Sequence, residues 1–474
     1  MLTQPVVGIL ELASKYRYGL TSHGAPLYLF RPYDETLPEF VVGSSERDTS
    51  TNRIAIVDVP VGAAPGAAKP RGMLVQLIGP VGDYDTEVRG LLAHYCPAKH
   101  KKPVIPPVDD SDDINREHID VAHGWITFHV DPAGCRDIDD AIAYNPATRE
   151  WAITIADAAT AVPANSQLDQ TAAAIGATFY SQEGEAVRSM LPREISQDSA
   201  SLLPSEKRRG VTLFYRDRTA TGQRWALSWI TVAHSFTYED FPASEVARDL
   251  GLDTVEPHQW IADQMIRYNT AAGQLLKEVG VGLLRTQAPA DVTAAANWDT
   301  IHPDLVRLAH EAATYEAVSI DIDADQSHAS LGISAYAHAS SPLRRYADLV
   351  NQRILKARIS RDCLPALDPA LPTLLNVRQK ANRRWARDLI FLENVDPGVV
   401  NTIDVIWVSA DQVFVPAWGR ILRIRHEVDV QKPLGTKGRI DIFCDPSQRN
   451  WKRRIMTAPH EEEASNSQLP TTLH

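Results

Sequence analysis

Short alternations of apolar and polar residues, broken by turns that contain glycine, dominate the first hundred residues of the chain. The alternation in residues 54–59 and the apolar run in residues 73–78 predict β-strands. The sequence Gly-Pro-Val-Gly-Asp at residues 79–83 is typical of a turn. Because residues 6–95 read as short strands separated by turns, we expect a small β-barrel over residues 1–98.

The middle of the chain has a different pattern. Residues 97–115 contain four prolines and then an acidic stretch, which predicts an extended linker over residues 99–115. Strand patterns then mix with amphipathic helix patterns, so we expect an α+β body over residues 116–396. Five helices are predicted, at residues 168–179, 257–278, 303–317, 342–359 and 372–393.

Short apolar alternations return near residue 400. Four of them, at residues 402–408, 412–416, 419–424 and 438–443, have the spacing of strands in a small barrel. We therefore expect a second β-barrel over residues 397–458. The last residues, 459–474, are rich in Glu, Ser, Asn, Gln and Thr, and this composition predicts a disordered tail.

Composition and charge restrict the class of protein. Hydrophobic residues make up 44% and charged residues 23% of the chain, which is ordinary for a globular protein. No apolar run approaches the length of a signal peptide or a transmembrane helix, so we expect neither segment and no membrane partner. We therefore expect an intracellular protein, cytoplasmic or nuclear. We also expect a monomer. The four cysteines lack the spacing of a disulfide framework or a zinc site. The net charge of −12 argues against binding nucleic acid by bulk electrostatics but leaves room for a local basic channel.

The first candidate site is a run of four aspartates within ten residues: Asp131, Asp137, Asp139 and Asp140. The alternating residues 126–131 predict a half-buried strand that ends at Asp131, and a hairpin over residues 141–155 follows the run. Two carboxylates about 4 Å apart repel by roughly 4 kcal/mol at an effective dielectric near 20, so such a cluster needs a cation or protons. Oxygen ligands favour Mg²⁺ or Mn²⁺, as one or two ions. The alternative is a solvated acidic loop.

The second candidate site is Ser-Pro-Leu-Arg-Arg-Tyr-Ala-Asp-Leu, residues 341–349. Ser341 is the expected N-cap and Pro342 the first residue of a helix, which would place Arg344 and Arg345 in its first turn. Free backbone N–H groups and two guanidinium groups at a helix start suit a phosphate. The alternative is an ordinary capped helix in which Arg344 pairs with Asp348.

Together these two segments resemble the signature segments of the ribonuclease II family, the RNB-domain exoribonucleases. Further segments resemble the family's motifs in the same order: Ala156-Asp157, Met190–Ser196, Ser201–Pro204 with Arg208, Phe236–Asp240 and His328–Leu331. The flanks resemble the eukaryotic exosome-type branch. Residues 6–10, 71–74 and 79–87 are similar to its second cold-shock barrel, and residues 400–457 to its C-terminal OB barrel. The first cold-shock barrel and the endonuclease domain of that branch have no counterpart in this sequence.

This resemblance implies an α+β fold in which a central RNB catalytic domain is flanked by N-terminal and C-terminal OB-fold β-barrels. It also implies an activity, the hydrolysis of single-stranded RNA from the 3′ end to nucleoside 5′-monophosphates. The four aspartates would hold one or two Mg²⁺ ions, with Asp139 positioning metal and attacking water. Arg344 would neutralise charge on the phosphoryl oxygens, and Tyr238 would contact the last nucleotide.

The resemblance further implies RNA-binding roles for four residues outside the acidic run: Tyr180, Arg208, Ser341 and Arg345. Tyr180 and Tyr238 have a simple alternative as core tyrosines. For the whole protein, the alternative is a catalytically inactive RNB-fold protein that binds RNA. Loss of the acids would mark that class, and all four are present. A metal-dependent DNA enzyme is a third interpretation, which no dedicated feature supports.

Overall fold

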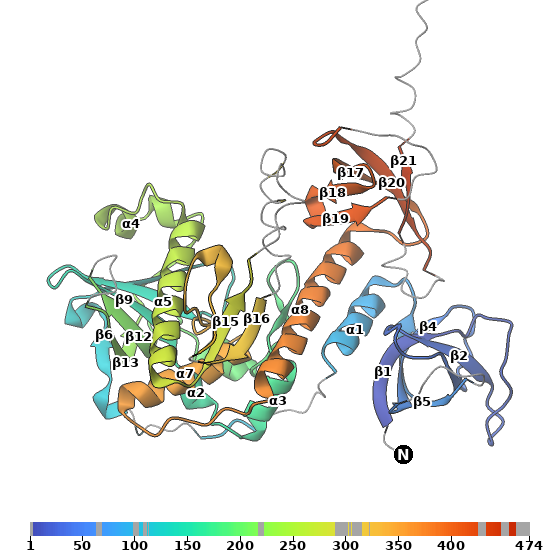
Figure 1. The fold of residues 1–474 in the computed structure, drawn as a ribbon, viewed down its shortest axis with the longest axis horizontal. Coiled ribbons are helices and arrows are strands. Elements are labelled where there is room, and N and C mark those ends of the chain that lie inside the picture. The colour runs from blue at the N-terminus through green and yellow to red at the C-terminus, as the bar shows by residue number, and fades with distance from the viewer. Residues whose placement is uncertain are drawn as a thin grey trace, which may run out of the picture. The chain divides into compact units, whose positions relative to one another are not determined.

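The chain folds into two compact units, shown in a computed structural model (Figure 1). One unit comprises Met1–Pro97, Val292–Ala309 and Arg383–His474, and the other comprises Ala98–Asp291 and His310–Asn382. The structure describes residues 3–62, 69–97, 104–107, 111, 113–216, 222–289, 302, 305, 315–321, 323–424, 433–446 and 455–460. Parts of the predicted linker, most of the predicted helix at 303–317 and the tail from residue 461 lie outside these residues.

The N-terminal part of the first unit is a closed β-barrel with strand order β1-β2-β3-β5-β4. Its strands are β1 (Thr3–Leu10), β2 (Leu27–Pro32), β3 (Phe40–Gly43), β4 (Arg53–Pro60) and β5 (Arg71–Pro80). Phe30, Phe40 and Val57 are fully buried in its core, because alternate residues of each strand point inward. The predicted barrel is therefore confirmed.

A helix after β5 was not predicted. Residues 84–95 were expected to continue the strand-and-turn pattern, but they form α1 (Tyr84–Tyr95). Asp83 caps this helix by accepting a hydrogen bond from the Thr86 amide, and Asp85 and Glu87 lie in its first turn. Acidic residues at the start of a helix are favoured by the helix dipole. The Asp83 cap and the acidic first turn therefore begin a helix directly after the turn at residues 79–83.

The second unit is built on a seven-stranded sheet with the order β14-β7-β8-β9-β12-β13-β6. Its strands are β6 (Glu117–Ile119), β7 (Ile126–Asp131), β8 (Asp140–Asn145), β9 (Glu150–Ala156), β12 (Lys207–Tyr215), β13 (Arg224–Thr231) and β14 (His234–Thr237). The two edge strands pair in parallel and the others antiparallel. The predicted hairpin of β8 and β9 is confirmed, with Asp140 opposite Ile155.

The strand before the acidic run is buried more deeply than predicted. Both Phe128 and Thr127 are fully buried, and His129 on the polar side of the alternation is only 4% exposed. The prediction of a half-buried strand was wrong, because side chains on both faces of β7 are buried. One face of the sheet packs on α5 (Pro257–Val279) and α7 (Tyr346–Ser360), whose apolar residues share a single core with it.

Further elements complete the second unit. They are α2 (Ala158–Ala161), α3 (Gln167–Ile175), α4 (Glu245–Asp249), the small sheets of β10 (Phe179–Tyr180) with β11 (Ala186–Arg188) and of β15 (Leu283–Gln287) with β16 (Tyr315–Ser319), and short 3₁₀ or π turns. Residues 315–317 were predicted to end a helix but pair as a strand with β15. The predicted helix at 168–179 ends earlier, at Gly176, whose φ of 82° stops the helix.

The arginine segment begins its helix later than predicted. Ser341 is not the N-cap; α7 starts at Tyr346, and Arg345 with extended backbone occupies the cap position. Residues 342–344 instead form a turn, and the end of this segment pairs with the chain after α3: the Thr178 amide donates to the Arg344 carbonyl at 3.0 Å, and the Tyr346 amide donates to the Gly176 carbonyl at 2.9 Å. Pairing with this neighbouring segment outweighs the local helix signal of Ser341-Pro342.

The C-terminal part of the first unit contains α8 (Leu371–Asn394), which begins in the second unit, and a five-stranded sheet of order β19-β18-β17-β20-β21. The strands are β17 (Val400–Ser409), β18 (Gln412–Val415), β19 (Arg420–Arg423), β20 (Lys437–Cys444) and β21 (Ile455–Pro459). Ile406, Val408 and Phe414 form its apolar core. The predicted α+β fold with β-rich flanks is confirmed. Among the described residues, no helix is long and apolar enough to cross a membrane.

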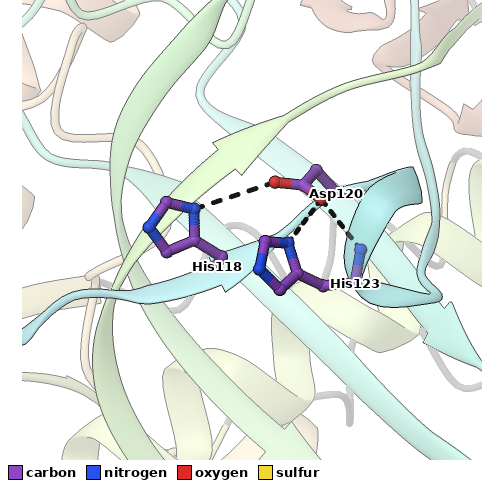
Figure 2. Close-up of side chains that lie close together, drawn as sticks. All are labelled: His118, Asp120 and His123. Atoms are coloured by element: carbon purple, nitrogen blue, oxygen red, sulfur yellow. Dashed lines mark hydrogen bonds and ion pairs between the residues drawn. The ribbon is translucent and has the colours of Figure 1, made fainter.

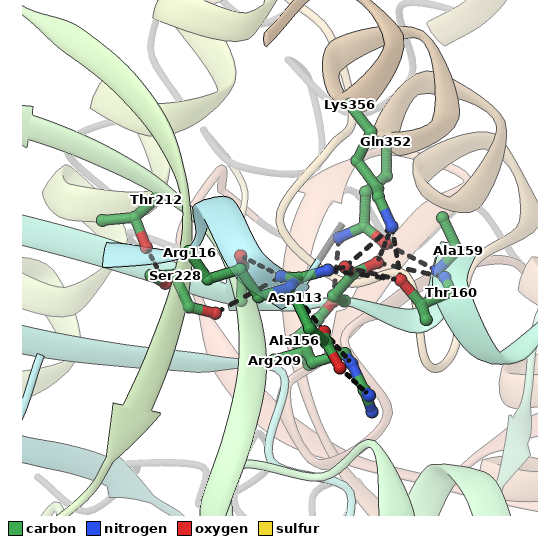
Figure 3. Close-up of polar contacts among 12 residues, drawn as sticks. Asp113, Arg116, Ala156, Ala159, Thr160, Arg209, Thr212, Ser228, Gln352 and Lys356 are labelled. Carbon is green, nitrogen blue, oxygen red and sulfur yellow. Dashed lines mark hydrogen bonds and ion pairs between the residues drawn. The ribbon is translucent and has the colours of Figure 1, made fainter. Parts of the chain in front are cut away.

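A buried ionic network ties the sheet to α7 (Figure 3). Asp157, directly after β9, has a fully buried side chain and accepts hydrogen bonds from Arg116 at 2.7 Å and from Lys356 of α7 at 2.9 Å. Gln352 of α7 also donates to the Ala156 carbonyl at 2.8 Å. Burial would raise the pKa of Asp157, but Lys356 and Arg116 outweigh burial and hold that pKa well below its ordinary value.

We expect Asp157→Asn to lower the free energy of unfolding at pH 7 by about 3–5 kcal/mol, because two buried cations lose their anion. Because the pKa of Asp157 is depressed by folding, its contribution is present above about pH 4 and is lost as the pH falls further. Urea unfolding at pH 7 and at lower pH tests this. The exposed pair of Glu278 and Arg358 supplies the control, since Glu278→Gln should leave stability nearly unchanged. Equal stability of Asp157→Asn and wild type at pH 7 would contradict the network's role.

Candidate active site

A cleft of about 940 Å³ in the second unit brings together most of the side chains singled out in the sequence. Its lining includes the four aspartates and five other predicted site residues: Asp131, Asp137, Asp139, Asp140, Tyr180, Tyr238, Ser341, Arg344 and Arg345. Segments more than two hundred residues apart in the sequence therefore meet in one hollow. Arg208 does not line it.

Two strands and the loop between them place the four aspartates. Asp131 is the last residue of β7 and Asp140 the first of β8, so both carboxylates lie at one end of neighbouring strands. Asp137 and Asp139 lie in the connecting loop. The backbone N–H of Ala156 donates to the Asp139 carbonyl at 2.8 Å, which continues the pairing of β8 with β9 by one residue.

Ser201 fixes this loop from outside the cleft. Its buried hydroxyl donates to the Arg136 carbonyl at 2.7 Å and accepts from the Ile138 amide at 2.9 Å. Arg208 supports it, because the Arg208 Nε donates to the Ser201 carbonyl at 3.0 Å. Arg208 thus contacts the segment that holds the acidic loop.

Two of the aspartates are held by side chains, Asp131 by a residue of its own strand β7 and Asp137 by a residue of β10. His129 Nδ1 lies 2.9 Å from Asp131 Oδ2, and the Tyr180 hydroxyl donates to Asp137 Oδ2. Burial and the carboxylate of Asp137 raise the pKa of Tyr180, so Tyr180 is a neutral donor at physiological pH. Tyr180 therefore links β10 to the acidic loop.

The contact between the two candidate sites is a direct ion pair. Arg344 Nε donates to Asp139 Oδ2 at 3.0 Å, and the backbone amide of Leu343 donates to Asp139 Oδ1 at 2.9 Å. The predicted alternative, a pair of Arg344 with Asp348, is not formed; Arg345 Nη2 donates to Asp348 Oδ1 at 2.7 Å instead. The Arg344 side chain remains 45% exposed, whereas that of Asp139 is 3% exposed. The guanidinium can therefore reach both Asp139 and a ligand in the cleft.

Burial sets the charge of the acidic residues. It raises the pKa of Asp139 to about 7, although Arg344 and the Leu343 amide favour the carboxylate. Burial and the neighbouring carboxylates of Asp131 and Asp139 raise the pKa of Asp140 well above its ordinary value. At neutral pH this end of the cleft therefore holds protons unless a cation replaces them.

The donor set fits a hard divalent cation, because all four acids offer carboxylate oxygens. Among the described residues, the three side chains whose donor atoms lie within 4.8 Å of one another are elsewhere, at His118, Asp120 and His123. No three of the four aspartates bring their carboxylate oxygens within this distance of one another among the described residues. A shared ion would require these carboxylates to turn toward one another, exchanging partners such as Tyr180 for the metal.

Several cleft residues were not identified from the sequence. Asn269 of α5 is buried and binds the segment before α7 with both atoms of its side-chain amide. Its Oδ1 accepts from the Ala339 amide at 2.9 Å, and its Nδ2 donates to Ser340 Oγ at 3.1 Å. His338 lies in this segment and contacts Arg285. Burial, followed by Arg345 and Arg285, lowers the pKa of His338 well below its ordinary value, so its imidazole is neutral. The one signal for Asn269 in the sequence is its position as a polar residue within an amphipathic helix pattern.

An aromatic pair forms another part of the lining. The rings of Tyr238 and His258 stack with centroids 3.7 Å apart and planes inclined by 16°. Tyr238 is only partly buried, and burial with the charges of Asp131 and Asp140 raises its pKa to about 12. Both rings line the cleft beside the acids, and Tyr238 also packs against the core. His258, at the start of α5, carried no motif that would have identified it.

Comparison with known proteins identifies the family of the chain. The family model described as "RNB domain" matches residues 120–249 and 243–361. Ribonuclease R of Helicobacter pylori is 24% identical over 72% of this chain and 64% of its own length. The exosome complex exonuclease RRP44 homolog A of Arabidopsis thaliana is 25% identical over 66% of this chain and 44% of its own length. The chain thus spans less than two thirds of these relatives.

Solved structures share the fold at low sequence identity. Yeast Ssd1, described as a pseudonuclease, has a TM-score of 0.68 at 16% identity and covers 97% of this chain and 68% of its own. Mycoplasma genitalium RNase R in complex with ribose-methylated single-stranded RNA has a TM-score of 0.60 at 13% identity, covering 96% of this chain and all of its own. These likenesses support the fold and leave the chemistry to be argued from the site.

We expect binding of Mg²⁺ to the cleft to release protons below about pH 7 and to strengthen as the pH rises toward that value. The reason is that Asp139, with a pKa raised to about 7, must lose its proton before it binds the ion. Calorimetric titration at pH 6 and pH 8, in two buffers of different ionisation enthalpy, counts the protons. Asp139→Asn should reduce the release, while the exposed Asp362→Asn should not. Affinity that is independent of pH, without proton release, would contradict the assignment.

Proposed function

The chain belongs to the RNB family, and on this premise we propose that it hydrolyses single-stranded RNA from the 3′ end and releases nucleoside 5′-monophosphates. The observation that carries this proposal is the ion pair of Asp139 with Arg344 at the acidic end of one cleft. It joins a carboxylate cluster suited to divalent cations with a guanidinium suited to a phosphate. Relatives named as ribonucleases and exonucleases support the substrate class.

Asp131, Asp137, Asp139 and Asp140 are the residues that would hold one or two Mg²⁺ or Mn²⁺ ions. Such ions, when bound, lower the pKa of a bound water and offset charge on the attacking and leaving oxygens. Asp139 is the residue we assign to positioning the ion and the attacking water. Its raised pKa is consistent with this role, because it exchanges a proton for a cation near neutral pH.

Arg344 is assigned to the phosphate. When substrate enters, its exposed guanidinium would donate hydrogen bonds to the phosphoryl oxygens, where negative charge develops during the reaction. The Ser341 hydroxyl accepts from Arg344 Nη2 at 3.1 Å and so orients the guanidinium. Arg345, 28% exposed and paired with Asp348, would add a second cation for the RNA backbone.

The remaining contacts concern the nucleotides. Tyr238, stacked on His258, offers an aromatic surface for a terminal base, and stacking of this kind tolerates any sequence. Tyr180 is assigned to the RNA through its place in the cleft lining and its bond to Asp137. For Arg208 we favour an indirect role, because it supports Ser201 and is absent from the lining. A monomer in an intracellular compartment, cytoplasmic or nuclear, remains a prediction.

A second candidate is an RNA-binding protein without catalytic activity. The fold likeness to yeast Ssd1, which is described as a pseudonuclease, is the observation that favours this second candidate. The presence of all four aspartates and of Arg344 in one cleft argues for catalysis instead.

We expect the protein to release mononucleotides from single-stranded RNA with a free 3′ end in Mg²⁺, and to stop when a chelator is added. Asp139→Asn should lower kcat by about 10²-fold or more, because the site loses a charged ligand while its shape is kept. Product analysis by chromatography measures this, with Asp362→Asn as the control outside the cleft.

Three other outcomes would decide against the proposal. Release that is unaffected by Asp139→Asn would contradict the assignment of the metal site. Tight binding of RNA without release would favour the inactive RNA-binding protein. Equal cleavage of matched DNA would favour a nuclease that does not discriminate the sugar.

We expect Tyr238→Ala to raise the Kd for single-stranded RNA by roughly 5- to 150-fold, since base stacking contributes about 1–3 kcal/mol per base. Fluorescence anisotropy in the presence of a chelator measures binding without cleavage. Tyr238→Phe is the matched control, because it keeps the ring and its stack on His258 while it removes the hydroxyl. If both variants weaken binding equally, the hydroxyl rather than the stacked ring is responsible.

A further inference from the structure

A second cluster of potential metal ligands lies outside the cleft, where β6 meets the turn that leads to β7 (Figure 2). His118, Asp120 and His123 each offer one donor atom, and these three atoms lie within 4.8 Å of one another. None of the three lines the acidic cleft. β6 is an edge strand of the seven-stranded sheet, so the cluster is open to solvent.

Both imidazoles turn the same nitrogen toward the carboxylate. His123 Nδ1 lies 2.7 Å from Asp120 Oδ1, and His118 Nδ1 lies 3.8 Å from Asp120 Oδ2. The two rings stack with centroids 5.0 Å apart and planes inclined by 30°. Figure 2 shows His118 and His123 on the same side of Asp120, with the nitrogens converging on it. The arrangement offers two nitrogen ligands and one oxygen ligand around one point.

Local folding accounts for only part of this arrangement. Asp120 Oδ1 caps the 3₁₀ turn Val121–His123 by accepting from the His123 amide at 3.0 Å, which explains Asp120 and its closeness to His123. Strand alternation places His118, two residues earlier, on the same side of the extended chain as Asp120, but neither the cap nor the alternation gives its Nδ1 a hydrogen bond. The gap of 3.8 Å between His118 Nδ1 and Asp120 Oδ2 is too long for a hydrogen bond. An ion with bonds of about 2.0–2.2 Å to each atom would span it.

We propose that His118, Asp120 and His123 bind a zinc ion through His118 Nδ1, Asp120 and His123 Nδ1. Two imidazoles and one carboxylate form a ligand set that suits Zn²⁺, with water in the fourth position. Nitrogen ligands disfavour Mg²⁺, which takes oxygen ligands such as those of the acidic cleft. The chain thus carries two cation sites of different chemistry, one of oxygen ligands and one of mixed nitrogen and oxygen ligands.

The position of the site indicates its effect. His118 lies opposite Trp229 in the pairing of β6 with β13, and His123 ends the turn that precedes β7. An ion bound to both would tie the edge strand to the entry of β7, the strand that ends at Asp131. Zinc would therefore stabilise this edge of the sheet, because it binds the folded arrangement and not the unfolded chain.

The test is a titration of the full-length protein with Zn²⁺ at pH 7.5, in excess Mg²⁺ to occupy the oxygen ligands of the cleft. We expect one equivalent of Zn²⁺ to bind at this cluster and to raise the melting temperature. His118→Ala and His123→Ala should each weaken that binding by about tenfold or more. Even the loss of a residue that only hydrogen-bonds to a metal ligand lowers metal affinity by about 10- to 100-fold. His23→Ala, at an exposed histidine outside the cluster, is the matched control.

Asp120→Asn separates metal binding from folding. The amide oxygen of asparagine can still cap the turn, so the variant keeps the fold, but it lacks the charged ligand and should weaken Zn²⁺ binding by a similar factor. Substitution with Co²⁺ adds a direct readout, because the ligand field bands of bound cobalt should be lost in the same variants. Zn²⁺ binding that is unchanged in all three variants, or present in none of the proteins, would overturn the proposal. Each of these readouts is independent of RNA cleavage.

Discussion

The burial of carboxylates beside one another is the constraint on which the cleft depends. Asp139 and Asp140 are adjacent in sequence and desolvated, and Asp131 raises the pKa of Asp140 further. Such a group costs free energy in the folded state unless protons, cations or donors offset its charge. Arg344 and the Leu343 amide stabilise only one member, Asp139. A cation that binds the four carboxylates would offset the remaining cost of their burial.

The surrounding structure holds the constrained groups in place by contacts with segments that lie far apart in the sequence. Ser201 and Arg208 support the acidic loop, Asn269 binds the segment before α7, and hydrogen bonds to residues 176–178 hold the turn that carries Arg344. The network around Asp157 ties the end of β9 to α7. Such contacts position catalytic groups more rigidly than a loop alone could.

The sequence predicted the parts of this site whose signals are local. The aspartate run at the end of an alternating strand and the hairpin after it are such signals, and the structure brings Asp131, Asp139 and Arg344 into one cleft as the resemblance implied. Ser341 was misassigned as an N-cap because the competing partner, residues 176–178, is distant in sequence. The stack of Tyr238 on His258 and the role of Asn269 depend on tertiary packing in the same way. Residues 315–317 were mistaken for helix because their strand partner, β15, lies nearly thirty residues earlier.

The most direct test of the central claim is to locate the cation. Crystals of the protein soaked with Mn²⁺, which gives anomalous scattering, would show where a divalent ion binds. The account predicts one or two anomalous peaks in the cleft, at about 2.1 Å from carboxylate oxygens among Asp131, Asp137, Asp139 and Asp140. A protein that degrades RNA in Mn²⁺ but shows no peak at these carboxylates would contradict it.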